Sequence, residues 1–290
     1  MKTISRRSFA KRMRSYGKRP FSLFLAGVAV LSAGITLAVL AALLLYILVK
    51  GIPNLRPELF AWEYNTANVS MMPAVINTLT ITGMTLIIAV PAGIFSAIYL
   101  VEYAKRGNRF VSLVRITTET LSGIPSIVFG LFGYLFFNIY LGWGYSILGG
   151  ALTLAIMVLP LMIRTTETAL LAVPDFYREG SFGLGAGKLR TVFRVVLPSA
   201  VPGILAGVIL AAGRIVGETA ALLYPAGTAA EAADGFFSSG RTLAVHMYAL
   251  LNEGLYMEQA YATAVILLVM VVGINALSSF IAKKAGVKES

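Results

Sequence analysis

The chain has 290 residues, of which 58% are hydrophobic and only 13% are charged. Its mean hydropathy of +0.81 excludes an ordinary soluble domain and indicates a membrane protein. The formal net charge is +11, but no basic patch interleaved with aromatic residues accompanies it, so nucleic acid is excluded as a partner and anionic membrane lipid is favoured. The absence of cysteine excludes disulfides and thiolate metal sites, and no metal site is expected.

Six transmembrane helices are predicted from the segments that lack charged residues, because a span needs about 20 residues. A turn at residues 141–146, "LGWGYS", separates the third span from the fourth. The fold class is therefore an all-α polytopic membrane protein. The predicted helices cover residues 21–49, 76–101, 121–140, 146–163, 199–223 and 259–282.

The positions of Lys and Arg predict the orientation, because cytoplasmic segments hold the excess of basic residues. Eight lie in the N-terminal tail, four in the 104–117 loop, five in the 164–198 loop and three in the C-terminal tail. Both termini are therefore expected in the cytoplasm. The expected divisions are a basic cytoplasmic tail at 1–20, an N-terminal transmembrane helix at 21–50, a core of five transmembrane helices at 70–282 and a cytoplasmic tail at 283–290.

Two short motifs suggest other functions but do not fit them. "SRRSFAK" at 5–11 resembles a twin-arginine export signal, yet the apolar stretch that follows is far longer than a signal core of about 7 to 15 residues, so a retained anchor is favoured. "GLGAGKL" at 183–189 resembles the end of a phosphate-binding loop. It lacks Ser or Thr after Lys188, and no buried strand precedes it, so the chain is not expected to bind ATP itself.

The 165–198 loop is the largest predicted cytoplasmic segment. Its apolar residues recur near helical spacing among basic ones, which predicts short amphipathic helices that meet at Gly183, Gly185 and Gly187 and lie across the membrane surface. The tetrapeptide "TTET" begins this loop at 165–168 and also occurs at 117–120, which is weak evidence for a repeat.

The same loop fits the pattern E-A-A-x3-G-x9-I-x-L-P, which resembles the coupling loop of ABC-importer permeases. Gly180 and Ser181 replace the two alanines, and Val195 replaces the isoleucine, so small or β-branched volume is kept at all three positions. The resemblance implies a short helix that enters a groove on a separate ATPase. The residues assigned to ATPase coupling are Glu179, Gly180, Ser181, Gly185, Val195, Leu197 and Pro198.

From about residue 70 onward the chain resembles phosphate-importer permeases, more the PstA type than the PstC type. The resemblance is carried by "NTLTITGMTLIIAVPAGIFSAIYLVEYA", "LSGIPSIVFGLFGY", "GRTLAVHMYALLNEG" and the segment from Arg164 to Leu223. It implies the type I ABC-importer permease fold, in a bacterial or archaeal cytoplasmic membrane. It also implies import of inorganic phosphate by alternating access, driven by ATP and Mg on a partner. The implied partners are a second permease (PstC type), a cytoplasmic ATPase dimer (PstB type) and an extracytoplasmic phosphate-binding protein (PstS type); this chain binds no cofactor and is not an enzyme.

The segment "AGRIVGETAALLYP" at 212–225 places Arg214 and Glu218 four residues apart within a predicted span. A charge at the bilayer centre costs roughly 2.5 to 3.5 kcal/mol on insertion scales, so such groups usually mark a path or a site. In the phosphate-importer family the R-x-x-G-E-T segment, matched here by Arg214, Gly217, Glu218 and Thr219, is associated with translocation. Arginine can donate to a tetrahedral oxyanion, and Glu218 can accept a hydrogen bond from a protonated phosphate oxygen. The alternative is that Arg214 and Glu218 only neutralise each other one helical turn apart.

Other function classes remain open from the residues alone. An intramembrane enzyme would need a nucleophile and a base at membrane depth, but His246, Asp175 and Asp234 are all expected in loops, with His246 solvated. An ion-coupled secondary transporter would suit the intramembrane charges equally well, although it has no use for the 165–198 pattern. A permease for another oxyanion and a structural or signalling membrane subunit also stay compatible with the residues.

Overall fold

The computed structural model describes residues 20–105 and 107–284, and within these ranges it is helical with no β-strand. The "SRRSFAK" motif and nearly all of both tails lie outside the described residues. The chain divides into two compact units, Met1–Lys50 and Gly51–Ser290.

The described part of the first unit is the helix α2 (Pro20–Gly51), which confirms the predicted helix at 21–49. Most of its 32 residues are apolar, they occupy the whole circumference, and most of its described side chains are exposed. A helix without a polar face is typical of a membrane span. Its length and composition suffice to cross a bilayer.

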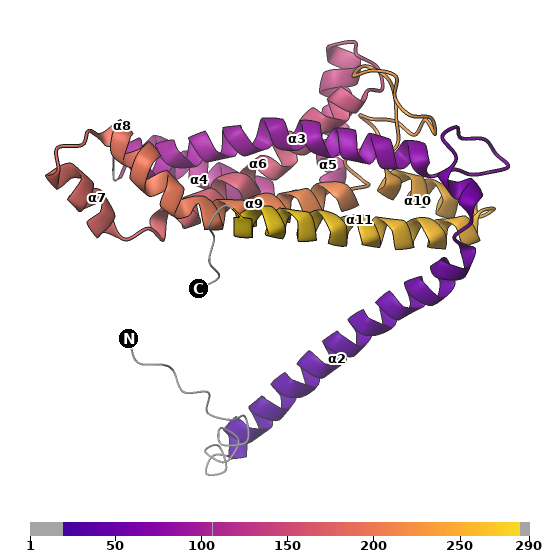
Figure 1. The fold of residues 1–290 in the computed structure, drawn as a ribbon, viewed down its shortest axis with the longest axis horizontal. Helices are drawn as coiled ribbons and strands as arrows, with labels where there is room; N and C mark the ends of the chain where they lie inside the picture. The colour runs from indigo at the N-terminus through magenta and orange to yellow at the C-terminus, as the bar shows by residue number, and fades with distance from the viewer. Residues whose placement is uncertain (1–19, 106, 285–290) are drawn as a thin grey trace. The chain divides into compact units, whose positions relative to one another are not determined.

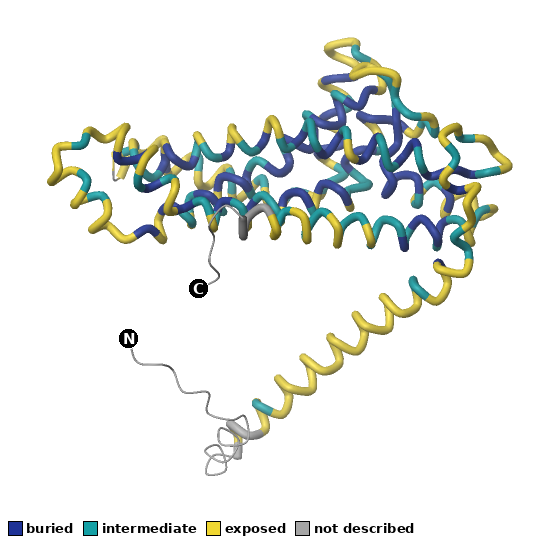
Figure 2. Tube along the Cα trace, viewed as in Figure 1, coloured by how far each residue is buried: buried dark blue, intermediate teal, exposed yellow. Residues whose placement is uncertain are grey.

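The second unit is a bundle of long helices that run side by side (Figure 1). Their inner faces are buried and their outer faces are exposed (Figure 2). One close approach joins α3 to α6, where a Cβ at Gly93 would lie 2.5 Å from the Cβ of Met162, so only glycine fits. The long helices are α3 (Met72–Ile98), α6 (Ile147–Leu171), α9 (Leu197–Gly217) and α11 (Met257–Lys284).

The predicted third helix at 121–140 is wrong in its start and in its straightness. The chain forms α4 (Arg109–Ser122), and then α5 (Ser126–Gly133), which continues into the π-helical η4 (Tyr134–Tyr140). Helix α4 and the continuous α5–η4 segment meet at an angle of 103°. Pro125 explains the break, because a residue that precedes proline is displaced from the α conformation. Over the described residues, five helices are long and apolar enough to cross a membrane, or six if the bent pair is one span.

The predicted fifth helix at 199–223 also ends too late. Helix α9 stops at Gly217, and Glu218 has extended backbone angles (φ −75°, ψ 129°). The turn that follows lies against α5, since a Cβ at Gly130 would be 2.9 Å from the carbonyl oxygen of Ala220. The predicted outer loop at 224–258 contains a further helix, α10 (Leu243–Glu253).

The 165–198 segment forms a helical hairpin at one end of the bundle. Its first residues extend α6 to Leu171, beyond the predicted end at 163. Helix α7 (Asp175–Gly183) and helix α8 (Lys188–Thr191) then form the α7–α8 hairpin, and the π-helical η5 (Val192–Val196) leads into α9. Gly185 has φ +80°, so the predicted glycine turn is confirmed. The remaining short elements are η1 (Ile52–Asn54), η2 (Pro57–Phe60) and η3 (Tyr99–Tyr103).

Candidate functional site

Arg214 lies in the last turn of α9, and its side chain is exposed. Among the described residues it has neither a hydrogen-bond partner nor an ion-pair partner. Glu218 lies beyond the helix end, where its Oε1 accepts a hydrogen bond from the amide of Ala221 at 3.3 Å. The two charges therefore do not form the neutralising pair that helical spacing would allow. The early end of α9 at Gly217 is the reason, since it takes Glu218 off the helix face.

Arg214 contributes to a cleft of about 390 Å³ between α4, α6 and α9, which we call the Arg214 cleft. Glu218 and Thr219 do not line it. Its polar and charged lining is supplied by Arg115, Thr118, Glu119, Ser122, Arg164, Glu167, Thr168 and Arg214.

Both "TTET" segments supply a glutamate to this cleft. Glu119 comes from the copy at 117–120 on α4, and Glu167 comes from the copy at 165–168 on α6. Glu167 forms an ion pair with Arg115. The sequence had not singled out these residues, and the repeated tetrapeptide was the signal that could have found them.

The charges of the Arg214 cleft favour an anion. Arg115 is paired with Glu167, whereas Arg164 and Arg214 have no ion-pair partner among the described residues. Two free guanidinium groups can each present N–H donors to the oxygens of an oxyanion. The hydroxyls of Thr118, Ser122 and Thr168 are also at the lining, but all three donate to backbone carbonyls of their own helices.

The residues assigned to ATPase coupling lie on two arms of the chain at the α7–α8 end. Glu179, Gly180 and Ser181 are on α7, whereas Val195 is on η5 and Leu197 and Pro198 begin α9. Ser181 joins the arms through a 2.9 Å hydrogen bond between its Oγ and Thr191 Oγ1. Gly185 is exposed at the turn between them.

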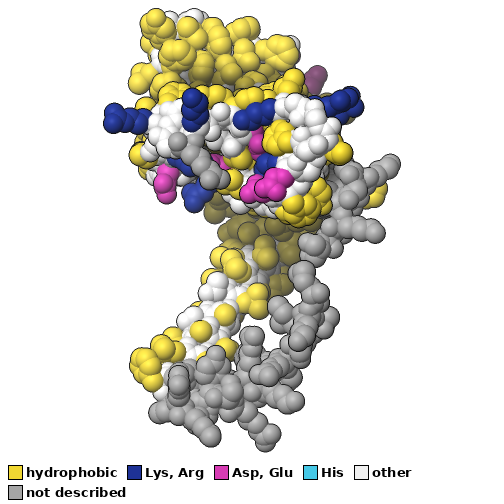
Figure 3. Space-filling model, turned by 90° about the vertical axis from the view of Figure 1, so that its left-hand side faces the viewer, with side chains coloured by type: hydrophobic (Ala, Val, Ile, Leu, Met, Phe, Trp, Pro, Cys, Tyr) yellow, Lys and Arg dark blue, Asp and Glu magenta, His cyan; other side chains and the backbone are white. Residues whose placement is uncertain are grey.

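This end of the bundle presents an apolar and basic surface. Leu184 is 91% exposed at the tip of the hairpin. Basic side chains lie around the edge of this face (Figure 3). The other exposed apolar side chains are Phe176, Tyr177, Phe182, Leu189 and Phe193. Exposed apolar side chains that form a surface of this kind indicate a contact with another protein or with the membrane.

His246 is fully buried in α10, so the expectation of a solvated loop residue is wrong. Both of its ring nitrogens are buried without a partner among the described residues. Burial, together with the neighbouring Arg241 guanidinium, lowers the pKa of His246 from 6.5 to about 3. The Arg241 guanidinium lies 5.0 Å from the centre of the Tyr64 ring, which faces His246 edge-on. His246 is therefore a neutral core residue.

Among the described residues no cluster of His, Asp and Glu could hold a metal ion.

Residues 89–285 match the family described as binding-protein-dependent transport system inner membrane component. The probable ABC transporter permease protein YqgI of Bacillus subtilis (strain 168) is 36% identical over 79% of this chain and 83% of its own length. The phosphate transport system permease protein PstA 1 of Mycobacterium tuberculosis (strain CDC 1551 / Oshkosh) is 35% identical over 72% of this chain and 69% of its own length. PstA of Haemophilus influenzae is 34% identical, with 74% and 76% covered.

Solved structures of ABC transporters share the fold. A bacterial ABC transporter involved in the import of the acidic polysaccharide alginate covers 93% of this chain and 99% of its own, with a TM-score of 0.65 and 15% identity. The MetNI methionine ABC transporter in an inward-facing conformation covers 74% and 94%, with a TM-score of 0.57 and 18% identity. The chain therefore belongs to the family of binding-protein-dependent transport system inner membrane components, and it is the non-enzymatic, multi-pass permease subunit of an ABC importer.

Proposed function

We propose that this permease translocates inorganic phosphate and that Arg214 contacts the anion. The observation that carries the proposal is the free guanidinium of Arg214 in a cleft with a second unpaired arginine, Arg164. An arginine that already has a carboxylate partner would need no ligand, whereas an unpaired one offers donors to an oxyanion. The substrate class is supported by relatives that are named phosphate transport system permease proteins.

Phosphate differs from sulfate in carrying a proton at neutral pH, so a carboxylate can accept a hydrogen bond from it. Glu119 lines the Arg214 cleft without an ion-pair partner among the described residues, and it is a candidate for this acceptor. Glu218 and Thr219 lie just beyond Arg214, outside the cleft lining. We propose that they meet the anion at another stage of alternating access. An importer of a different oxyanion is the second candidate, because the same arginines would also serve it.

We further propose that ATP and Mg bind on a partner ATPase, which docks at the α7–α8 hairpin. Exposed Glu179 and Gly180, the turn at Gly185 and the apolar tip at Leu184 would enter its groove. Permeases of this family work with an ATPase and a substrate-binding protein. The finer partners proposed are a PstB-type ATPase dimer, a PstC-type second permease and a PstS-type binding protein.

The α7–α8 end is proposed to face the cytoplasm of a bacterium, or of an archaeon. Lys188, Arg190 and Arg194 are exposed at this end, and basic residues favour the cytoplasmic side. A cysteine replacing exposed Leu184 should resist an impermeant thiol reagent in intact cells, whereas one replacing exposed Phe237 should react. Because the chain has no cysteine, each label would be unique within it. Labelling at position 184 from outside would reverse the proposed orientation.

The test of the substrate is phosphate uptake in cells that lack other phosphate importers and carry this chain with its partners. Arg214→Gln should strongly reduce uptake while the variant still inserts and assembles. Glu218→Gln is interpretable alone, because Glu218 has no ion-pair partner that the change would leave unpaired. Sulfate and arsenate uptake measured beside phosphate distinguish another oxyanion as the substrate. Near wild-type phosphate uptake by the assembled Arg214→Gln variant would refute the role of Arg214.

A further inference from the structure

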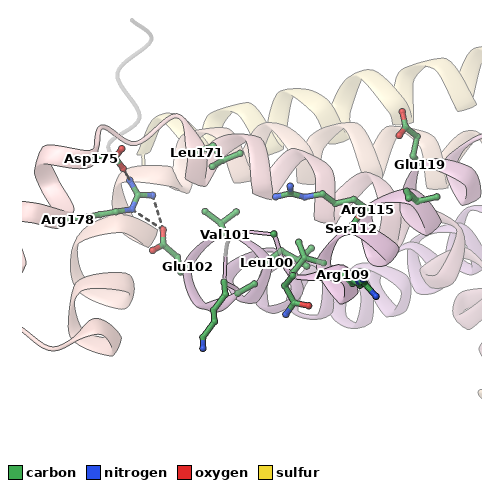
Figure 4. A pocket seen from close by; sticks show the side chains of 16 residues that line it. Leu100, Val101, Glu102, Arg109, Ser112, Arg115, Glu119, Leu171, Asp175 and Arg178 are labelled. Atoms are coloured by element: carbon green, nitrogen blue, oxygen red, sulfur yellow. Dashed lines mark hydrogen bonds and ion pairs between the residues drawn. The ribbon is translucent and has the colours of Figure 1, made fainter.

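Arg178 projects from α7 and uses all five of its guanidinium N–H groups within the protein. Figure 4 shows its bonds to Glu102 and Asp175. Its Nε and Nη2 donate to Oε1 of Glu102 at 3.1 and 2.8 Å. Its Nη1 donates to the carbonyl oxygen of Val173 at 2.8 Å and to Oδ1 of Asp175 at 3.2 Å. Nη2 also donates to the carbonyl oxygen of Leu170 at 2.9 Å. Since arginine has five N–H donors, Arg178 has none left for a ligand.

The bond to Glu102 joins two elements that are far apart in the chain. Glu102 lies on η3, the π-helical continuation of α3, and 76 residues separate it from Arg178. The side chains are 14% and 9% exposed, so water screens the pair only weakly. Charge-assisted hydrogen bonds are shorter and stronger than neutral ones, and they depend on the relative position of the two groups. The pair therefore fixes the position of α7 relative to the end of α3.

A second contact joins the other arm of the hairpin to the same turn of η3. The Nζ of Lys188 on α8 lies 5.1 Å from the centre of the Tyr103 ring, next to Glu102. The hydrogen bond between Ser181 and Thr191 holds α7 to α8. Both arms of the hairpin are thus attached to the end of α3.

The opposite end of α3 holds the loop that precedes α10. Asn77 donates from Nδ2 to the carbonyl oxygen of Glu231 at 3.0 Å and accepts the amide of Ala233 at Oδ1 at 3.0 Å. The Oγ1 of the next residue, Thr78, accepts the amide of Leu243 at 2.8 Å. Helix α3 is therefore hydrogen-bonded to the hairpin at one end of the bundle and to this loop at the other.

We infer that α3 transmits movement of the α7–α8 hairpin to the 231–243 loop, and that Arg178 and Glu102 are the positioning residues that connect the hairpin to α3. The inference rests on the proposed docking of an ATPase at the hairpin, and it does not depend on which anion is carried. When the ATPase moves the hairpin, α3 moves with it, and the bonds of Asn77 and Thr78 pass the movement to the loop. Without the Arg178–Glu102 pair, only the Lys188–Tyr103 contact and apolar packing still join the hairpin to α3, so α3 follows the hairpin less closely.

The first test needs no substrate. A cysteine replacing exposed Asp234, next to the anchored Ala233, is the only thiol in the chain and reports on the 231–243 loop. In the full complex, adding ATP should change the rate at which this cysteine is labelled. Glu102→Gln keeps the size of the side chain but removes its charge, and it should reduce the change at least fivefold. The inference would be overturned if Glu102→Gln left the ATP-dependent change in labelling undiminished. It would also be overturned if ATP did not change the labelling rate of the position-234 cysteine in the protein that keeps Glu102.

A matched control distinguishes this role from the loss of any ion pair. Arg56 and Glu258 form a pair at the other end of the bundle, 3.9 Å apart, with side chains 64% and 67% exposed. Arg56→Gln should leave the ATP response unchanged. An equal loss of response in Arg56→Gln and Glu102→Gln would show that the effect is not specific to α3.

A second pair of variants guards against a simple folding defect. Cysteines replacing both Glu102 and Arg178 should lower the number of phosphate ions moved per ATP hydrolysed while ATP hydrolysis continues. Joining them with a cleavable thiol cross-linker should restore the ratio, and cleavage should lower it again. An unchanged ratio throughout would overturn the inference. If the wild-type complex moves no phosphate, the substrate proposal fails, whereas the labelling at position 234 still decides the role of α3.

Discussion

Arg178 and Arg214 lie in two regions of the same bundle that treat a guanidinium group in opposite ways. At the junction of α7 with α3, every N–H of Arg178 is bonded to the protein and the side chain is almost buried. In the Arg214 cleft, the guanidinium of Arg214 has no partner among the described residues and is exposed. A saturated arginine holds elements together, whereas an unsaturated one is available to a ligand. Substitution of Arg178 should therefore lower the stability of the fold, whereas substitution of Arg214 should impair transport.

The largest effect is expected at Arg214. If Arg214 contacts the anion as proposed and donates two charge-assisted hydrogen bonds to it, Arg214→Gln removes them, which amounts to about 3 kcal/mol or roughly 100-fold in uptake. The melting temperature of the purified complex should not change, because Arg214 has no bond to another described residue to lose. The measurements are uptake of labelled phosphate and thermal unfolding in detergent, made on the same preparation. The first tests the loss of transport, and the second tests the unchanged melting temperature.

Arg214→Lys is the control that keeps the positive charge but lacks the planar, bidentate N–H donors of the guanidinium group. It should have more uptake than Arg214→Gln but less than the wild type. If Arg214→Gln lowered both the uptake of phosphate and the melting temperature, Arg214 would have a structural role like that of Arg178, and the distinction between the two arginines would be lost.

The converse pattern is expected at Arg178. Arg178→Gln leaves Glu102 charged and nearly buried, and breaking a buried pair in this way costs about 3 kcal/mol. The melting temperature should therefore fall by roughly 5 to 10 °C. The double variant Arg178→Gln, Glu102→Gln removes the unpaired charge and should recover part of the loss. No recovery in the double variant would show that the bonds of Arg178 to Leu170 and Val173 matter more than its pairing with Glu102.

The sequence predicted the helical class, the apolar segments and the glycine turn at Gly185, because these depend on local composition. It could not predict the Arg178–Glu102 pair, since no local pattern relates residues that are 76 positions apart. The end of α9 was misplaced for the same reason: the turn after Gly217 packs against Gly130, and that contact is tertiary.

The candidate site was only partly accessible to sequence analysis. Arg214 stood out because it is a charge in an apolar segment. The companions of Arg214 in the cleft come from α4 and α6, and only the repeated "TTET" hinted that Glu119 and Glu167 lie together. Pro125 accounts for a break after α4, but the 103° angle depends on how α5 packs against its neighbours.

His246 provides a third case, a titratable group that is buried without a polar partner among the described residues. Because its pKa falls to about 3 in the folded protein, the unfolded chain binds a proton near pH 6.5 and the folded chain does not. Stability is therefore unaffected above pH 6.5 and decreases as the pH falls from 6.5 toward 3. At pH 5 the loss is roughly 2 kcal/mol.

The measurement is the melting temperature of the complex at pH 7.5 and pH 5, for wild type and for His246→Gln. The variant cannot be protonated, so its melting temperature should fall less between the two pH values. An identical fall in both proteins would mean that His246 does not contribute to the acid sensitivity.

The smallest effect is expected within the α7–α8 hairpin, at two glycines that are two residues apart. Gly185 has φ +80°, whereas Gly187 has φ −72°, and a Cβ would meet no atom within 4 Å at either position. Alanine at Gly185 should therefore cost about 1 kcal/mol from backbone strain alone, and alanine at Gly187 should cost almost nothing. The melting temperatures of the two variants measure this difference without any change in contacts.

If the anchors at Arg178 and Lys188 determine the shape of the hairpin, Gly185→Ala should keep the ATP response of the 231–243 loop despite its lower stability. If the turn determines the shape, the response should weaken in Gly185→Ala and persist in Gly187→Ala, which would place the control of the hairpin in its turn and not in its attachment to α3.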